Sequence, residues 1–365
     1  MKPILFNFPD GELEQFVIGY NQPKFRAKQI RDWLLRGAPN FDAMKNLPEK
    51  LRRDLDATAQ TMPVQIVKKL ESGDGQTTKF LLELADGEQI ECVLMRTTYG
   101  NSVCVSSQAG CAMGCRFCAS TLLGLKRNLS VEEMYAEVLV AQWCLRHIDG
   151  VSDNIRPNGD ANNNDVSHIV IMGTGEPLQN TQNVIGFMER LNRDMNIGWR
   201  RITLSTCGIV PGIDDLIQWG RPINLAISLH APTDELRRQI MPIANKYSIH
   251  DVMNAAWRFT DLHNRQLMVE YILLGTVDGE LLNSTPECAE QLSQLLHGKN
   301  CMVNLIPWNS VGERQFTSPS NNAVHRFQDV LIKNGIHTRI RRERGTDIGS
   351  ACGQLRLNNA KGVKK

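Results

Sequence analysis

Four cysteines lie close together in the stretch 104–118, which reads CVSSQAGCAMGCRFC. Three of them, Cys111, Cys115 and Cys118, follow the spacing C-x3-C-x2-C. Thiolates at this spacing can reach three corners of one iron–sulfur cube, and no fourth cysteine follows at a comparable distance, so one iron would stay open. An open iron suits a cluster that binds a small molecule and does chemistry on it.

A zinc site and a set of buried thiols are the alternative interpretations of this loop. Zinc sites more often combine a C-x2-C pair with a second pair or with two histidines downstream, and neither follows here. Five further cysteines stand in apolar or helical contexts and are predicted to be core residues: Cys92, Cys144, Cys207, Cys288 and Cys301.

The composition indicates a soluble, cytoplasmic protein with reduced thiols. The chain has 365 residues, of which 42% are hydrophobic, so it can bury a large core in one domain with an appendage or in two domains. It has no apolar run of about 18 residues and no start resembling a signal peptide, so we expect no membrane span. Ten cysteines without such a signal argue against a disulfide framework.

The net charge of +2 conceals two basic ends. Residues 23–54 contain nine Lys and Arg against four Asp and Glu, and residues 333–365 contain nine against two. The middle of the chain is therefore net acidic. This distribution indicates a polyanionic partner that is held from two sides, although a solvated basic face is the alternative for either end alone.

A repeating strand–helix pattern from residue 101 onward must position the cysteine loop. Such a pattern predicts a parallel sheet with right-handed crossovers, whose site lies at the carboxyl ends of the strands. The loops after the strands should therefore face one opening. The predicted strands are 102–106, 168–173, 201–206, 223–230, 267–274 and 302–308, and the predicted helices are 131–146, 184–193, 211–219, 250–263 and 285–296.

Two smaller regions precede this core. Residues 23–60 predict a small helical module with basic surfaces. Three β-rich segments separated by hairpin-turn signals then predict a small antiparallel linker sheet, at 64–70, 77–84 and 89–95. Glu91 lies between apolar residues in the last of them. It is either a solvent-facing strand residue or an inward carboxylate that acts as a base.

The sequence Gly173-Thr174-Gly175-Glu176-Pro177 follows a strand and precedes a helix. Its glycines allow the backbone to approach a ligand closely, and Glu176 could accept a hydrogen bond from an ammonium group. Alone, the motif is weak, because any turn between a strand and a helix can contain glycines.

The order of the motifs resembles one family. CVSSQAGCAMGCRFC is followed by MGTGEPLQN, LSTCGIVP, LAISLHAP, NLIPWN and ACGQL, a series similar to the RlmN/Cfr group of radical S-adenosylmethionine (SAM) RNA methyltransferases. The resemblance covers essentially the whole chain and implies an α/β fold, a partial (β/α)6 TIM-like barrel with a small N-terminal helical domain and linker β-hairpins. The implied division is an RNA-binding accessory domain at 1–60, a β linker at 61–96, a radical SAM core at 97–342 and a catalytic tail at 343–365.

The resemblance implies methylation of adenine C2 in 23S ribosomal RNA, and in tRNA at the adenosine next to the anticodon. This carbon bears only hydrogen and has no lone pair to attack a sulfonium methyl group, so a radical must reach it. In the family's mechanism the residue matching Cys352 first becomes S-methylcysteine, and a 5′-deoxyadenosyl radical then activates its methyl group. The match makes Glu91 the proton acceptor and Cys104 the partner of Cys352 in a transient disulfide.

The resemblance also implies cofactors and partners. They are a [4Fe–4S] cluster on Cys111, Cys115 and Cys118, two SAM molecules per turnover, an electron donor such as flavodoxin, and the two RNA substrates. From the sequence itself we expect a cytoplasmic protein that does not bind membranes, and a monomer because nothing in the sequence demands a partner subunit. The residues that match the family's SAM-binding positions are Gly175, Glu176, Ser205, Ser228, Leu229, His230 and Asn309.

Two rival functions remain open. A Cfr-type enzyme, which methylates C8 of the same adenosine in ribosomal RNA, would share all the named residues. A non-catalytic iron–sulfur or zinc RNA-binding protein would cleave no SAM. Two features depart from the family's pattern. Thr174 stands where the family more often has Met, and residues 147–166 form an Asn-rich insertion that we expect to be a surface loop or disordered.

Overall fold

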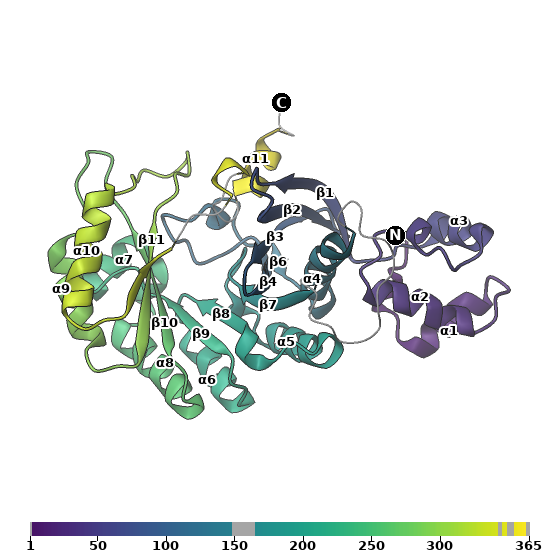
Figure 1. The fold of residues 1–365 in the computed structure, drawn as a ribbon, viewed down its shortest axis with the longest axis horizontal. Helices are drawn as coiled ribbons and strands as arrows, with labels where there is room; N and C mark the ends of the chain where they lie inside the picture. The colour runs from purple at the N-terminus through teal and green to yellow at the C-terminus, as the bar shows by residue number, and fades with distance from the viewer. Residues whose placement is uncertain (1, 148–164, 342–344, 349–353, 363–365) are drawn as a thin grey trace.

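The computed structural model describes residues 2–147, 165–341, 345–348 and 354–362. Nearly all of the Asn-rich insertion lies outside the described residues, as does Cys352. One ten-stranded sheet organises the described fold, in the order β1-β2-β3-β4-β7-β8-β9-β10-β11-β12. Helices flank this sheet, and a small helical unit lies at one end of the molecule (Figure 1).

Seven parallel strands form the core and confirm the predicted α/β class. They are β4 (Gly100–Val105), β7 (Val166–Ile171), β8 (Ile202–Thr206), β9 (Asn224–Ser228), β10 (Leu267–Leu273), β11 (Cys301–Pro307) and β12 (Thr338–Ile340). The helices between and beside them are α4 (Val131–Arg146), α5 (Thr181–Met195), α6 (Val210–Trp219), α7 (Asp234–Ile240), α8 (Ile249–His263), α9 (Pro286–Leu296) and α10 (Asn321–Lys333). The helices cover the sheet, and apolar side chains of the strands are buried beneath them. Val303 and Leu305 of β11, for example, are each 0% exposed to solvent.

The linker strands require one correction. β1 (Val64–Glu71), β2 (Thr77–Leu84) and β3 (Gln89–Thr97) are antiparallel as predicted, but they do not form a separate sheet. β3 pairs with β4, so the linker continues the main sheet. The reason is burial, because β2 is buried on both faces, and a separate two-layer hairpin could not cover it.

The N-terminal unit contains α1 (Asp10–Ile18), α2 (Phe25–Leu35) and α3 (Glu49–Thr58). It shares one continuous apolar core with α4 and the main sheet. The Arg190 guanidinium lies 4.6 Å from the ring centroid of Phe6 and 4.5 Å from that of Tyr135, so a cation–π contact joins α5 to both regions. The domain limits given above stay a prediction. No helix in the described part of the chain combines the length and apolar character that a membrane crossing needs.

A substitution at Gly37, just after α2, can test how closely the N-terminal unit packs against α4. Its φ is +86°, and a Cβ there would lie 2.4 Å from the carbonyl oxygen of Leu139 on α4. Gly279 has nearly the same φ of +87°, with nothing within 4 Å of the corresponding Cβ. We expect Gly37→Ala to lower the free energy of unfolding by about 1–3 kcal/mol more than Gly279→Ala, because only the first change adds overpacking to backbone strain. Equal losses in urea unfolding would contradict this packing.

Candidate active site

β2, β3 and β4 place Lys79, Glu91 and Cys104 on one face of the sheet. Val93 pairs with Lys79 on β2 and with Cys104 on β4. Glu91 is two residues from Val93 and therefore points the same way. All three side chains are buried. The opposite face, which carries Cys92, packs against α4. Strand register thus brings the predicted base and the predicted resolving cysteine together.

Both carboxylate oxygens of Glu91 have partners. Oε2 lies 2.9 Å from Nζ of Lys79, and each of the two side chains is 3% exposed. Oε1 accepts a hydrogen bond of 2.8 Å from the backbone N–H of Arg356, in the first turn of α11 (Gln354–Gly362). A carboxylate in this position satisfies an otherwise unpaired N–H and interacts favourably with the helix dipole. Glu91 therefore points inward and the solvent-facing alternative is wrong, while its role as a base stays a prediction.

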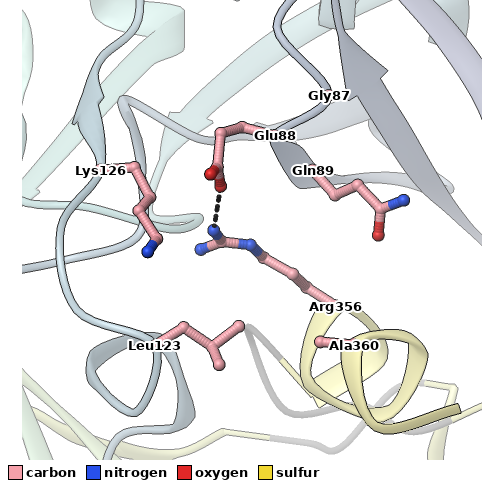
Figure 2. Close-up of a pocket in the computed structure, with 7 residues that line it drawn as sticks. All are labelled: Gly87, Glu88, Gln89, Leu123, Lys126, Arg356 and Ala360. Carbon is pink, nitrogen blue, oxygen red and sulfur yellow. Dashed lines mark hydrogen bonds and ion pairs between the residues drawn. The ribbon is translucent and has the colours of Figure 1, made fainter. Parts of the chain in front are cut away.

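α11 docks on the linker strands through further polar contacts (Figure 2). Arg356 extends from α11 across a hollow, and its Nη2 lies 2.8 Å from Oε2 of Glu88 (Figure 2). Lys126 lines the same hollow from the loop beyond the cysteines. One turn further along the helix, Nδ2 of Asn359 donates to Oε1 of Gln89 at 2.9 Å. The tail helix is thus held at its first turn and beyond.

Cys352 lies outside the described residues, so its disulfide with Cys104 stays a prediction. The described segments on either side of it both contact the linker. Before it, Oδ2 of Asp347 accepts a hydrogen bond of 2.8 Å from the backbone N–H of Gly73, in the turn between β1 and β2. After it, α11 begins two residues later and contacts Glu91.

The cysteine loop is held through its backbone by neighbouring elements. Nη2 of Arg314 donates to the carbonyl oxygen of Cys118 at 2.7 Å, and Nε1 of Trp308 donates to that of Phe117 at 3.1 Å. The backbone N–H of Arg116 donates to the carbonyl oxygen of Ile240, the last residue of α7 (Asp234–Ile240), at 2.9 Å. These contacts define the path of the loop within the protein alone, as a preorganised ligand site requires.

The thiols of Cys111 and Cys115 are buried and that of Cys118 is half-buried, and burial disfavours the charged form of the first two. It raises the pKa of Cys111 to about 12 and holds that of Cys115 well above its usual range. Ligation requires thiolates, so these positions need a bound positive group. Among the described residues, no three His, Cys, Asp or Glu side chains converge on a single metal ion. The thiolates of an iron–sulfur cube bind different irons and need not converge on one point.

Arg237 gives an independent test of whether the loop fits a cluster. Its side chain is 0% exposed, and its Nη1 has no hydrogen-bond partner among the described residues. A buried cation without an anion is costly. The loop thiolates and their cluster would together be anionic, so the residues present fit this group.

Gly175 brings the turn after β7 against the entry to the cysteine loop. Its φ is +114°, and a Cβ there would lie 2.7 Å from Cβ of Gln108 and 2.8 Å from Oγ of Ser107. Only glycine permits this approach. Oε1 of Gln108 also accepts a hydrogen bond of 2.8 Å from the backbone N–H of Glu176. The turn is thus fixed beside the loop.

The Glu176 carboxylate links two strand ends. It is 3% exposed and accepts hydrogen bonds from the backbone N–H of Leu178 at 3.0 Å, from Oγ1 of Thr206 at 2.7 Å and from the backbone N–H of Cys207 at 2.8 Å. Burial raises its pKa, and these donors oppose that shift. Glu176 therefore has a structural role in addition to its predicted contact with an ammonium group.

The other predicted SAM-binding residues follow neighbouring strands of the sheet. Oγ of Ser205 on β8 lies 3.3 Å from Oγ of Ser228 on β9, and both side chains are half-buried. Asn309, just beyond β11, is also half-buried. Leu229 differs, because its side chain is 0% exposed, its N–H donates to a β10 carbonyl and its own carbonyl accepts from Arg237. It can therefore offer a ligand little more than van der Waals contact.

His230 is a neutral imidazole in a strained position. It has a φ of +61°, and its Nδ1 accepts a hydrogen bond of 3.0 Å from the backbone N–H of Ile272, so any ring proton is on Nε2. Burial, together with the Arg237 charge, lowers its pKa to about 3. Its ring meets Phe117 edge to face at 4.9 Å, which places it against the cysteine loop.

Comparisons with known proteins agree with this geometry. Residues 4–61 match the family described as the ribosomal RNA large subunit methyltransferase N-terminal domain. The chain is 43% identical over 356 residues to a probable dual-specificity RNA methyltransferase RlmN of Clostridium acetobutylicum, covering 97% of each. It is 46% identical over 343 residues to the protein of the same name from Lachnoclostridium phytofermentans, covering 93% of this chain and 90% of the other. A solved radical SAM methyltransferase from Sphaerobacter thermophilus is 38% identical with a TM-score of 0.80, covering 96% of this chain and 98% of that one.

The partial barrel and the C-x3-C-x2-C loop at the carboxyl ends of its strands define a radical SAM fold. Because the relatives align over nearly the whole chain, it belongs to the RlmN family of dual-specificity RNA methyltransferases. The family resemblance seen in the motifs is therefore confirmed.

Two residues of the site were not predicted from the sequence. Lys79 stands within a β2 segment that reads TTKFLLEL, and a lysine inside a largely apolar strand was the available signal. Arg237 lies in the charged helix DELRRQI, where nothing distinguishes it from its exposed neighbour Arg238.

The buried pair of Lys79 and Glu91 gives a stability prediction. We expect Lys79→Met or Glu91→Gln alone to lower the free energy of unfolding by about 3–5 kcal/mol, because each leaves a buried charge without its partner. The double variant should lose less than the sum by about 1–3 kcal/mol. The half-exposed pair of Lys69 and Glu71, 3.6 Å apart, is the control, and its coupling should stay below about 1 kcal/mol. Additive losses at Lys79 and Glu91 in urea unfolding would contradict the pairing.

Proposed function

We propose that the protein methylates C2 of adenine in 23S ribosomal RNA and tRNA as a radical SAM methyltransferase. One observation supports this most strongly. Glu91 and Cys104 share a buried face of the sheet, and the tail that carries Cys352 is docked on the same strands. Glu91 and Cys104 therefore share one face, and the described segments on both sides of Cys352 contact the linker that carries Glu91, which supports the roles that the family resemblance gives to all three residues.

Cys111, Cys115 and Cys118 would hold a [4Fe–4S] cluster, with SAM at the neighbouring strand ends. When bound, the cluster and SAM supply a carbon-centred radical by reductive cleavage of SAM. Gly175 and Glu176 would contact the amino acid part of SAM, with Ser205, Ser228, His230 and Asn309 around the rest. Two SAM molecules are used per turnover, because one provides the methyl group and the other the radical.

The protein's own residues carry the methyl group and release the product. Cys352 would accept a methyl group on its sulfur, lose one hydrogen atom of that group to the SAM-derived radical, and join adenine C2 through the remaining methylene carbon. Glu91 would take the proton that C2 loses, while the adduct gives back the single electron that the donor supplied for SAM cleavage. The Cys104 thiolate would then attack the sulfur of Cys352, so that the disulfide forms as the bond from sulfur to the methylene carbon breaks; that carbon keeps the electron pair and takes up a proton, which releases the methylated RNA.

The partners follow from the charge distribution and the chemistry. The target base must leave its stack, which costs on the order of a few kcal/mol. Phosphate contacts from the two basic ends of the chain would offset this cost. We further propose that the protein is a cytoplasmic monomer, and that an electron donor such as flavodoxin reduces it.

The nucleoside product tests the activity. We expect reduced, cluster-loaded protein with SAM to convert an unmodified RNA transcript to 2-methyladenosine and to release 5′-deoxyadenosine, both measured by mass spectrometry. 8-Methyladenosine instead would assign the protein to the C8-methylating type. Absence of 5′-deoxyadenosine would leave the non-catalytic RNA-binding alternative.

Cys352→Ala tests the methyl-carrying residue. We expect it to lower RNA methylation at least about 100-fold with unchanged iron content, because the substituted side chain has no sulfur to accept the methyl group. Cys144→Ala is the control, since this half-buried thiol on α4 packs against the core. RNA methylation at the wild-type rate in Cys352→Ala protein would contradict the proposed role.

A further inference from the structure

The guanidinium of Arg237 is a buried charge. It donates hydrogen bonds to backbone carbonyl oxygens, but it forms no ion pair with an acidic side chain among the described residues. Nε donates to the carbonyl oxygen of Leu229 at 3.1 Å, and Nη2 donates to that of Cys207 at 2.7 Å and to that of Ser228 at 3.4 Å. Nη1 is buried without a hydrogen-bond partner among the described residues. None of the ion pairs between described residues includes Arg237, whose side chain is 0% exposed.

Such an environment is costly for a cation unless an anion faces it. Carbonyl dipoles stabilise a guanidinium but leave its net charge, and charged side chains are rarely fully buried without a partner. Asp234 on the same helix is close enough to attract the Arg237 charge, but the two side chains form no ion pair among the described contacts, and the Asp234 carboxylate accepts a hydrogen bond of 2.8 Å from the backbone N–H of Ile249. The position therefore suits an anion that the protein chain itself does not supply.

The surroundings of Arg237 identify where that anion would lie. α7, which carries Arg237, is bonded at its last residue to the backbone of the cysteine loop. The contacts of Arg237 lead to the same loop, because its Nε donates to the carbonyl oxygen of Leu229, next to His230, whose ring meets Phe117 of the cysteine loop edge to face at 4.9 Å. The charged side chains near these contacts are Asp234 and Glu176, whose carboxylate accepts the backbone N–H of Cys207.

We propose that Arg237 is a positioning residue that provides the buried counter-charge of the iron–sulfur cluster. Its fixed positive charge favours the reduced cluster, which carries one more negative charge than the oxidised form. This inference rests on the proposed function only in requiring that the three cysteines hold a cluster. It does not depend on which RNA, or which carbon of adenine, is methylated.

Two substitutions distinguish the effect of the Arg237 charge from the effect of its hydrogen bonds. Arg237→Gln removes the charge and keeps a donor, whereas Arg237→Lys keeps the charge and loses the planar fork. Arg238→Gln is the matched control, because Arg238 is the next residue of the same helix and its side chain is 43% exposed. The midpoint potential of each cluster-loaded full-length protein is measured by redox titration with electron paramagnetic resonance, without SAM or RNA.

We expect Arg237→Gln to make reduction about tenfold less favourable, a shift of about 59 mV to more negative potential for one electron. The reduction equilibrium of Arg237→Lys should stay within about threefold of the wild type, and that of Arg238→Gln should equal it.

A folded Arg237→Gln protein that binds much less iron than Arg237→Lys would also support the proposal. It is overturned if Gln leaves the potential unchanged, or if Lys shifts it as far as Gln. Because SAM is absent, an effect on SAM binding alone would leave the potential unchanged, and loss of methylation would not alter this readout.

Discussion

The ion pair between Lys79 and Glu91 is the interaction on which the arrangement of the site depends. Removing two charges from water costs several kcal/mol per ion, and their attraction repays this only when the remaining polar atoms are satisfied. The second oxygen of Glu91 meets that condition by accepting the N–H of Arg356. β2, β3 and the tail helix therefore meet at one buried point, and the loss of either partner would break a buried ion pair beside the proposed chemistry.

Other buried charges follow the same principle at the ends of the strands. A parallel strand leaves backbone N–H and carbonyl groups without partners where it stops, and buried groups of this kind must be satisfied. Glu137 accepts the N–H of Ser106 after β4, with N–O distances of 3.2 and 3.0 Å to its two oxygens. Glu176 accepts the N–H of Cys207 after β8, and Arg237 donates to the carbonyls after β8 and β9. Charged side chains thus help to hold the loops that would bind the cluster and SAM.

Local patterns determined what the sequence could reveal. The six predicted core strands and five predicted helices are present because their apolar periodicity is regular, and motif spacing carried the family resemblance. β12 was missed because it has three residues in a basic run, and α7 because DELRRQI is short and charged. The joining of the linker to the main sheet depends on the pairing of β3 with β4, which no local signal encodes. The contacts of Lys79 with Glu91 and of Arg237 with strand-end carbonyls depend equally on tertiary packing.

The continuity of the linker with the main sheet explains how a tail residue could act with precision. A catalytic residue on a chain terminus needs anchors, since conformational freedom would otherwise spread it over many positions. Two described tail residues are anchored on the linker, Asp347 at Gly73 in the β1–β2 turn and Arg356 at Glu91 on β3. Because β3 pairs with β4, the strand that carries Cys104, a fixed register links these anchors to the cysteine loop. A linker folded as its own sheet would lack this fixed register, so the pairing of β3 with β4 is the feature that would allow the tail to act in the proposed active site.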